Sequence, residues 1–278
     1  MDGSPLILEV MISTCGPDGG RKIEAMNLPR LSGVTYLVSW QVCADKIVPE
    51  NLARRDDVRF LFLEGRGLSR NRNNCLDHAR GDILLVADDD LKFYPEGLQE
   101  IRRIFTQNPS LEYASFRYDS DYPKEYPAHA CSLAHLPKNF YQASIEIALR
   151  RESRAGRLRF CESFGLGAEK YTAGEEGLFL KKARLNGLDC RFFPVTIALH
   201  PARTTGVASR LSDGTIRAFG ACVAVEYPFS AILRIPLVSY RNSRQGKASF
   251  LRHLRLMFAG TLAALPGNIA SRYLKQPL

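Results

Sequence analysis

Three consecutive carboxylates, Asp88-Asp89-Asp90, are the residues in this sequence best suited to chemistry. They directly follow the apolar run Ile83–Ala87, which is typical of a strand covered on both faces. Open α/β sheets bind ligands at the carboxyl ends of their strands. In extended geometry Asp88 and Asp90 point the same way, so they could chelate one hard divalent ion that in turn holds a diphosphate. The alternative is a solvated acidic turn, which the position after a buried-type strand disfavours.

Arg72 is a second candidate, on a helix predicted over residues 69–80. Ser69 suits the N-cap of that helix. Arg72 shares a face with Leu68 and Cys75, and a guanidinium on an apolar stripe needs an anionic partner. A phosphate or one of the aspartates would serve. The alternative is an arginine that extends to the surface.

Two glutamates open another predicted helix, over residues 174–185. Thr172-x-x-Glu175 fits a capping box, which gives Glu175 a structural role. Glu176 has no such role, so it is a candidate general base for deprotonating a hydroxyl. The alternative is an ordinary acid in a first helical turn, favoured by the helix dipole. His200 follows an apolar strand-like run, where a lone histidine is more often structural than a metal ligand.

The elements that must position these residues alternate along the first 120 residues. Short apolar runs bounded by turn residues predict four strands, and helical patterns lie between them. This alternation indicates right-handed βαβ units and a parallel sheet, and therefore an α/β fold. These four strands are Leu6–Ile12, Val34–Val38, Val58–Leu63 and Ile83–Ala87. Two further strands are predicted over Tyr113–Tyr118 and Arg191–Leu199, and the further predicted helices are 21–28, 46–54, 95–107 and 138–150.

Composition bounds the class of protein. The 278 residues are 45% hydrophobic and 24% charged, which is typical of a globular chain. We expect no signal peptide, and no apolar run approaches the roughly 18 residues of a membrane-spanning helix. Seven dispersed cysteines without a Cys-x-x-Cys pair argue against a zinc ribbon or a disulfide framework. A reduced, cytoplasmic setting is the simplest interpretation.

The net charge of +9 is confined to the last 78 residues. Residues 201–278 hold eleven Lys and Arg against two acids, whereas the first 200 residues are neutral. A uniformly basic nucleic-acid binder would not divide its charge in this way. The basic stretch Arg241–Arg255 and the stripe formed by Leu251, Leu254, Met257 and Phe258 predict one basic amphipathic helix on an anionic bilayer. The alternative is that this stripe packs on the core.

The motifs in chain order resemble family-2 glycosyltransferases. Gly67–Asp90 contains an Arg-Asn on a helix, then Ala-x-Gly-Asp, an apolar strand and Asp-x-Asp. Gly174–Leu180, followed by Asn186-Gly187, is similar to the family's Glu-Asp motif and its helix. The resemblance covers about residues 6–200.

This resemblance implies a Rossmann-like GT-A fold with a mostly parallel central sheet flanked by helices. The change in charge balance after His200 adds a basic helical C-terminal extension, so we expect a catalytic domain, 1–200, and the extension, 201–278. Within the catalytic domain, 1–118 is the nucleotide-sugar half and 119–200 the acceptor half. The family usually has an Asp at the end of the second strand, and here Trp40 is expected to stack on the base instead. The implied residues are Glu176 and Glu175 for catalysis, Thr14, Trp40, Arg72, Asp88 and Asp89 for the donor, and Asp88, Asp90 and His200 for Mg²⁺ or Mn²⁺.

The implied function is inverting transfer of a sugar from a nucleotide-diphosphate donor to a hydroxyl of a glycan or lipid-linked acceptor. We expect cell-surface polysaccharide synthesis at the cytoplasmic face of the membrane, with no nucleic-acid partner. A sugar nucleotidyltransferase is an alternative, because Cys15–Lys22 faintly resembles the Gly-rich loop of that class. A catalytically inactive sugar- or lipid-binding protein is another. The sequence leaves open the donor sugar, the linkage and the oligomeric state.

Overall fold

One mixed sheet forms the centre of the computed structural model, which describes residues 5–42, 47–121, 124–137, 140–200, 211–246 and 249–278. Its first part is parallel, in the order β3-β2-β1-β4, which confirms the expected βαβ units. These strands are β1 (Leu8–Cys15), β2 (Val34–Gln41), β3 (Val58–Leu63) and β4 (Ile83–Asp88). The sheet continues through β8 (Ile147–Arg150), β6 (Tyr113–Ser120), β9 (Cys190–His200) and β5 (Lys92–Phe93), and β7 (Cys131–Ser132) pairs with β9.

The second part of the sheet brings distant residues to the end of β4. Strand β8 runs antiparallel to both β4 and β6, and β9 runs parallel to β6. The short strand β5, just after the aspartate triplet, pairs with the end of β9, with Lys92 opposite Leu199. This pairing places Asp90 beside His200, although 110 residues separate them in the chain.

Helices cover both faces of the sheet because alternate strand residues are apolar on both sides. In β1, Val10 and Ile12 face α1 (Gly19–Ala25) and α4 (Pro95–Gln107), whereas Met11 faces α3 (Leu68–His78) and α5 (Glu175–Leu185). The one-turn helix α2 (Glu50–Ala53) precedes β3. Short 3₁₀ turns lie at Ser144–Glu146, Arg154–Arg157 and Leu262–Ala264.

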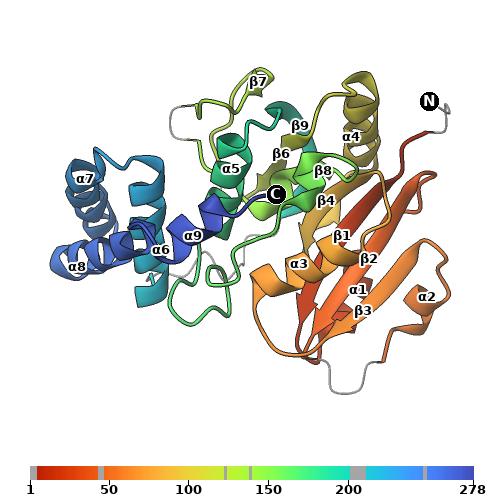
Figure 1. Ribbon diagram of the computed structural model, residues 1–278. Coiled ribbons are helices and arrows are strands. Elements are labelled where there is room, and N and C mark those ends of the chain that lie inside the picture. The colour runs from red at the N-terminus through yellow and green to blue at the C-terminus, as the bar shows by residue number, and fades with distance from the viewer. Residues whose placement is uncertain (1–4, 43–46, 122–123, 138–139, 201–210, 247–248) are drawn as a thin grey trace.

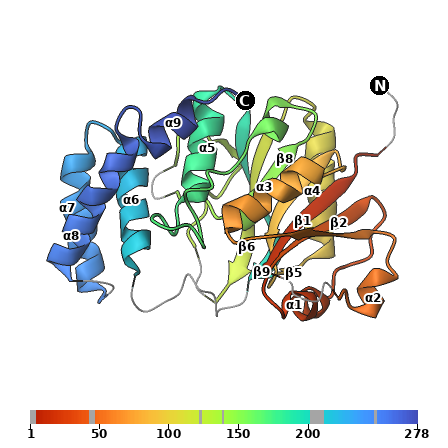
Figure 2. The ribbon, with the colours of Figure 1, turned by 60° about the horizontal axis from the view of Figure 1, so that its bottom comes forward.

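Four C-terminal helices lie beside this core: α6 (Asp213–Glu226), α7 (Ala231–Arg244), α8 (Phe250–Thr261) and α9 (Ile269–Lys275). Helix α6 lies between α5 and the outer pair α7 and α8 (Figures 1 and 2). Helices α6 and α9 join the core through a shared apolar cluster that includes Leu178 of α5, Ala218 and Tyr273. Helix α8 crosses α6 so closely that a Cβ on Gly220 would lie 2.0 Å from the Met257 carbonyl oxygen. Among the described residues no helix is both long and apolar enough to cross a membrane.

Two element predictions are wrong. Residues 144–150 form a 3₁₀ turn and strand β8, where a helix was expected over 138–150, of which 138–139 lie outside the described residues. Ile147, Ala148 and Leu149 are buried between β4 and β6, so packing in the sheet overrides their helical pattern.

The single helix predicted over Arg241–Arg255 is two helices, with a break after Arg244. Gly246 adopts a left-handed conformation there, with φ of 70°. The stripe expected to face a bilayer is divided as well, because Met257 packs inside the C-terminal helices while Leu251 is exposed. The predicted domain boundary at residue 200 adjoins residues 201–210, which lie outside the described part of the chain.

Candidate active site

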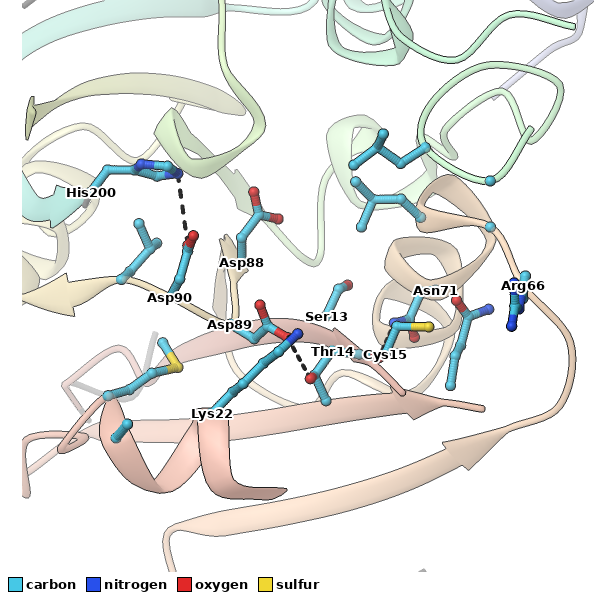
Figure 3. A pocket seen from close by; sticks show the side chains of 18 of the residues that line it. Ser13, Thr14, Cys15, Lys22, Arg66, Asn71, Asp88, Asp89, Asp90 and His200 are labelled. Carbon is cyan, nitrogen blue, oxygen red and sulfur yellow. Dashed lines mark hydrogen bonds and ion pairs between the residues drawn. The ribbon is translucent and has the colours of Figure 1, made fainter. Parts of the chain in front are cut away.

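A pocket of about 800 Å³ opens at the carboxyl ends of β1 and β4. Its walls come from the end of β2, helix α1, the start of α3, the loop at 166–167 and the end of β9. All three aspartates of the triplet line it, together with Thr14 and His200 (Figure 3). The topology therefore assembles most of the residues that the sequence nominated for the donor and the metal.

The three aspartates have different partners. Strand β4 ends at Asp88, and Asp89 and Asp90 form a turn, so the extended geometry expected for the triplet is wrong. Asp89 accepts hydrogen bonds from Thr14 Oγ1 at 2.5 Å and Lys22 Nζ at 2.9 Å. Asp90 Oδ1 is buried without a hydrogen-bond donor and lies 3.7 Å from His200 Nε2. Burial raises the pKa of Asp90, and the nearby His200 partly offsets that effect.

Asp88 and Asp90 fit a divalent cation. The unsatisfied oxygen of Asp90 needs a positive partner, and the partly exposed carboxylate of Asp88 lines the same pocket. No group of three or more potential ligands is already gathered as a metal site among the described residues. Mg²⁺ does not require one, because it is commonly held by one or two carboxylates plus substrate phosphates and water. His200 lies beside Asp90 in the same pocket.

Arg72 connects the pocket to the two glutamates of α5. Its guanidinium is buried and donates to Glu175 Oε1 at 2.9 Å, Asp88 Oδ1 at 2.9 Å and Ser144 Oγ at 2.6 Å. Glu176 Oε1 lies 3.9 Å from the same guanidinium. Burial alone would lower the pKa of Arg72, but the three carboxylates together raise it, so the side chain stays charged. The sequence allowed a phosphate or one of the aspartates as the partner of Arg72, and in the structure Arg72 donates to Asp88.

Glu176 has the electrostatics of a general base. Burial and the negative charge of Glu175 raise its pKa to about 8, against the lowering effect of Arg72. Its side chain nevertheless remains about one-fifth exposed. A carboxylate with a raised pKa is a stronger base than an ordinary glutamate and accepts a proton from a hydroxyl more readily.

The predicted caps of the two site helices are wrong. The N-cap of α3 is Gly67, and Ser69 Oγ instead donates to the Phe164 carbonyl oxygen at 2.6 Å. The N-cap of α5 is Gly174 in a left-handed conformation, and no capping box forms. Glu175 turns instead to Arg72, because a buried cation is a better partner for a carboxylate than a backbone amide at a helix end.

The glycine-rich segment of the 160s holds α3 and α5 together. Gly165 has φ of 105°, and a Cβ there would lie 2.9 Å from Ser69 Oγ and 3.0 Å from the carboxyl carbon of Glu175. The adjoining Leu166 carbonyl oxygen accepts from the Leu68 amide at 2.8 Å. These contacts fix the Arg72 and Glu175 side chains relative to each other.

Trp40 is not brought into the pocket, so its expected stacking on a base is corrected. The ring is only 3% exposed and lies beneath α1, where a Cβ on Gly19 would lie 2.4 Å from Trp40 Nε1. That nitrogen donates to the Gly16 carbonyl oxygen at 2.8 Å. A stacking role needs an open ring face, and this ring is covered by backbone.

Three cationic residues that sequence reasoning missed also line the pocket: Lys22, Arg66 and Lys92. Arg66 is exposed, and Lys22 extends from α1 toward Asp89 (Figure 3). Lys22 and Lys92 follow strand-ending turns, a position that could have signalled an anion site. Ser144, which lies beside Arg72, carried no sequence signal because its segment was expected to be helical.

A buried ion pair within residues 119–200 was also missed. Lys124 Nζ lies 2.6 Å from Glu146 Oε1, and both side chains are almost fully buried. Tyr126 OH donates to the same carboxylate oxygen at 2.7 Å. Burial lowers the pKa of Lys124 and raises that of Glu146, and the attraction between them works against both changes. The negative charge of Glu176 also works against the lowering of the Lys124 pKa, so Lys124 lies within electrostatic range of the candidate base.

The sheet order and the acidic pocket at the ends of β1 and β4 define a GT-A type α/β architecture. Residues 43–165 match the family described as Glycosyl transferase family 2. A comparison with curated proteins found no match. The resemblance seen in the sequence is thus confirmed: the chain carries a family-2 glycosyltransferase match on a GT-A fold.

Solved structures of S. aureus TarS share this fold. TarS 1–349 in complex with UDP-GlcNAc has a TM-score of 0.59 at 13% identity, covering 94% of this chain and 76% of that one. TarS 1–349 in complex with UDP has a TM-score of 0.59 at 13% identity, covering 92% of both chains. TarS 1–349 without a named ligand has a TM-score of 0.57 at 14% identity, covering 96% of this chain and 77% of that one. At these identities the likeness concerns the fold.

Proposed function

We propose that this protein is an inverting glycosyltransferase that takes its sugar from a nucleotide-diphosphate donor. The observation that carries the proposal is Arg72, whose guanidinium contacts Asp88 of the pocket on one side and the Glu175-Glu176 pair on the other. Donor-binding and proton-accepting groups are therefore held around one buried charge. The family match and the fold support the same class of reaction.

The donor diphosphate would lie in the pocket near the aspartates. Asp88 and Asp90 would hold Mg²⁺ or Mn²⁺, with His200 beside them, and the cation would neutralise charge on the departing diphosphate. Lys22, Arg66 and Lys92 add positive charge to the same walls. Asp89 has a positioning role, since it fixes Lys22 and the Thr14 hydroxyl.

Glu176 would complete the reaction on the acceptor side. The acceptor oxygen forms a bond to the anomeric carbon while the bond from that carbon to the diphosphate oxygen breaks. The hydroxyl proton passes to the Glu176 carboxylate, and the electron pair leaves with the nucleoside diphosphate. A single displacement from the opposite face inverts the anomeric centre. Glu175 stays paired with Arg72 and keeps the base in place.

The acceptor is proposed to be a glycan or lipid-linked hydroxyl used in cell-surface polysaccharide synthesis at the cytoplasmic face of the membrane. UDP-GlcNAc is the first donor to test, because a protein of similar fold is seen with it. The assay measures nucleoside diphosphate released from a panel of nucleotide sugars with Mg²⁺ or Mn²⁺ and a lipid extract as acceptor.

The variants in this assay are Glu176→Gln and, as a matched control, the exposed Glu169→Gln. We expect release by the wild type and the control and loss in Glu176→Gln. Release of pyrophosphate in place of nucleoside diphosphate would replace the proposal with a nucleotidyltransferase. Binding of a nucleotide sugar without turnover of any donor would indicate an inactive binding protein.

A further inference from the structure

Helix α7 presents apolar side chains outward as well as inward, because Ala231 and Ile235 are buried against α6 and α8 while other apolar residues of the helix are exposed. Ser239 and Asn242 face α8, where Ser239 Oγ lies 3.0 Å from His253 Nδ1 and Asn242 Nδ2 lies 2.9 Å from His253 Nε2. All three side chains are buried. A surface helix ordinarily confines its apolar stripe to the side that faces the core. The outward stripe of α7 therefore needs a partner.

That stripe is large and well exposed. Leu233, Leu237 and Tyr240 follow helical spacing on the side opposite the buried residues, and they are 70%, 69% and 60% exposed. Phe229, just before the helix, is 99% exposed. On α8, which packs against α7, Leu251 is also 75% exposed. We call Phe229, Leu233, Leu237 and Tyr240 the outer face; scattered single apolar residues would need no explanation, but four along one helix and the turn before it do.

Basic residues lie on α7 beside the outer face. From Tyr227 to Leu278 the sequence holds eight Lys and Arg and no acid. Arg244 lies on the same stripe as Leu237 and Tyr240, with Arg241 at its side. Neither of these arginines, nor Arg255 on α8, has an ion-pair partner within the described part of the chain. Unpaired arginines next to exposed apolar side chains match the chemistry of an anionic lipid surface, with phosphates above hydrocarbon.

We propose that the outer face of α7 docks this protein onto the surface of a bilayer that contains anionic phospholipid. The apolar side chains would enter the boundary between headgroups and acyl chains, and Arg241 and Arg244 would meet lipid phosphates. The docking that we propose is peripheral, with α7 lying along the bilayer surface. The surface differs from the stripe predicted from sequence, because α7, and not Met257 of α8, supplies most of it. The proposal does not depend on glycosyl transfer.

The test is co-sedimentation of the full chain with vesicles of phosphatidylcholine alone or mixed with phosphatidylglycerol. We expect binding to the anionic vesicles at low salt, and weaker binding as salt screens the arginines. The double substitution Leu233→Asp with Leu237→Asp should weaken the partition coefficient by ~10-fold or more, since each leucine loses its burial in lipid. Ile47→Asp, at a comparably exposed apolar position in the catalytic half, is the matched control and should bind as the wild type does.

Thermal unfolding and nucleotide-sugar binding of the double variant should match the wild type, because its substituted side chains touch neither the core nor the pocket. Equal binding of the double variant and the wild type to anionic vesicles would overturn the proposal, as would failure of the wild type to sediment. Sedimentation equilibrium tests whether a second copy of the chain binds the outer face instead. If the wild type self-associates through this face, ignores vesicles and becomes monomeric on substitution, a second copy of the chain and not a bilayer covers it.

Discussion

Replacing Arg72 with methionine should destabilise the protein strongly. Methionine keeps an unbranched apolar side chain but removes the guanidinium group, so Asp88 and Glu175 lose their buried cation. Breaking a buried ion pair by removing one partner typically costs about 3–5 kcal/mol. At about 2–4 °C per kcal/mol for a domain of this size, the melting temperature should fall by roughly 6–20 °C.

The loss of stability in Arg72→Met should grow as the pH rises. Arg72 lowers the pKa of Glu176, which burial and Glu175 have raised to about 8, so its removal raises that pKa further. A group whose folded pKa lies above its unfolded value stabilises the protein at low pH and loses that contribution as pH rises through the folded pKa. Below pH 8 Glu176 is protonated in both proteins and adds little to the difference. Above pH 8 Glu176 loses its proton in the wild type, where Arg72 stabilises the carboxylate. In the variant the same ionisation costs more free energy, so the difference in stability between the two proteins grows.

The assay is thermal unfolding of wild type and Arg72→Met between pH 6 and 9, with Arg103→Met as the control. Arg103 pairs with Glu100 on the exposed side of α4, where such pairs contribute little, so its variant should melt with the wild type. An Arg72→Met protein that melts with the wild type at every pH would refute the reasoning. A difference that shrinks as pH rises would refute the assigned electrostatics of Glu176.

Four further results are expected. Asp88→Asn and Asp90→Asn should each remove the metal-dependent part of nucleotide-sugar binding in calorimetry, and unchanged affinity in both would exclude the metal assignment. Glu176→Gln should lower kcat by roughly 10²–10⁴-fold with little change in donor affinity, and near-normal kcat would transfer the base role to another residue. The kcat/KM profile of the wild type should rise with pH at values well above those of an ordinary glutamate, because the pKa of Glu176 is raised, and a rise already complete at pH 5 would contradict this. Lys124→Met should leave the Glu146 charge buried and cost about 3–5 kcal/mol of stability, measured by urea unfolding against the wild type.

Much of the fold could be predicted because its first half is built from local patterns. The strands before Asp88 are short apolar runs that end in turn residues, and the helix Pro95–Gln107 has the bounds that its starting proline and apolar spacing predicted. The segment before Arg150 could not be predicted in the same way. Its helical spacing was overridden by its place between β4 and β6, which only the assembled sheet determines.

The site residues that local sequence patterns determine could likewise be predicted, and those that depend on distant contacts could not. The aspartates were predictable because they follow a strand, and chain order is enough to place them at its carboxyl end. The role of Arg72 as a common partner of Asp88 and Glu175 depends on contacts across 16 and 103 residues, which no local pattern contains. Trp40 is the opposite case, because its local position predicted a role that the folded structure removes. Its position at the end of β2 suggested a ligand contact, but the side chain turns under α1 and is covered by Gly19.

The most direct test of the proposed glycosyl transfer is product analysis with a single donor. Wild type, Glu176→Gln and Asp90→Asn are incubated with UDP-GlcNAc, Mn²⁺ and a lipid extract, and the released nucleotide and the anomeric configuration of the product are determined. The account predicts UDP and an inverted glycoside from the wild type, donor binding without transfer in Glu176→Gln, and loss of metal-dependent donor binding in Asp90→Asn. Transfer with retention of configuration, or full activity in Glu176→Gln, would contradict it.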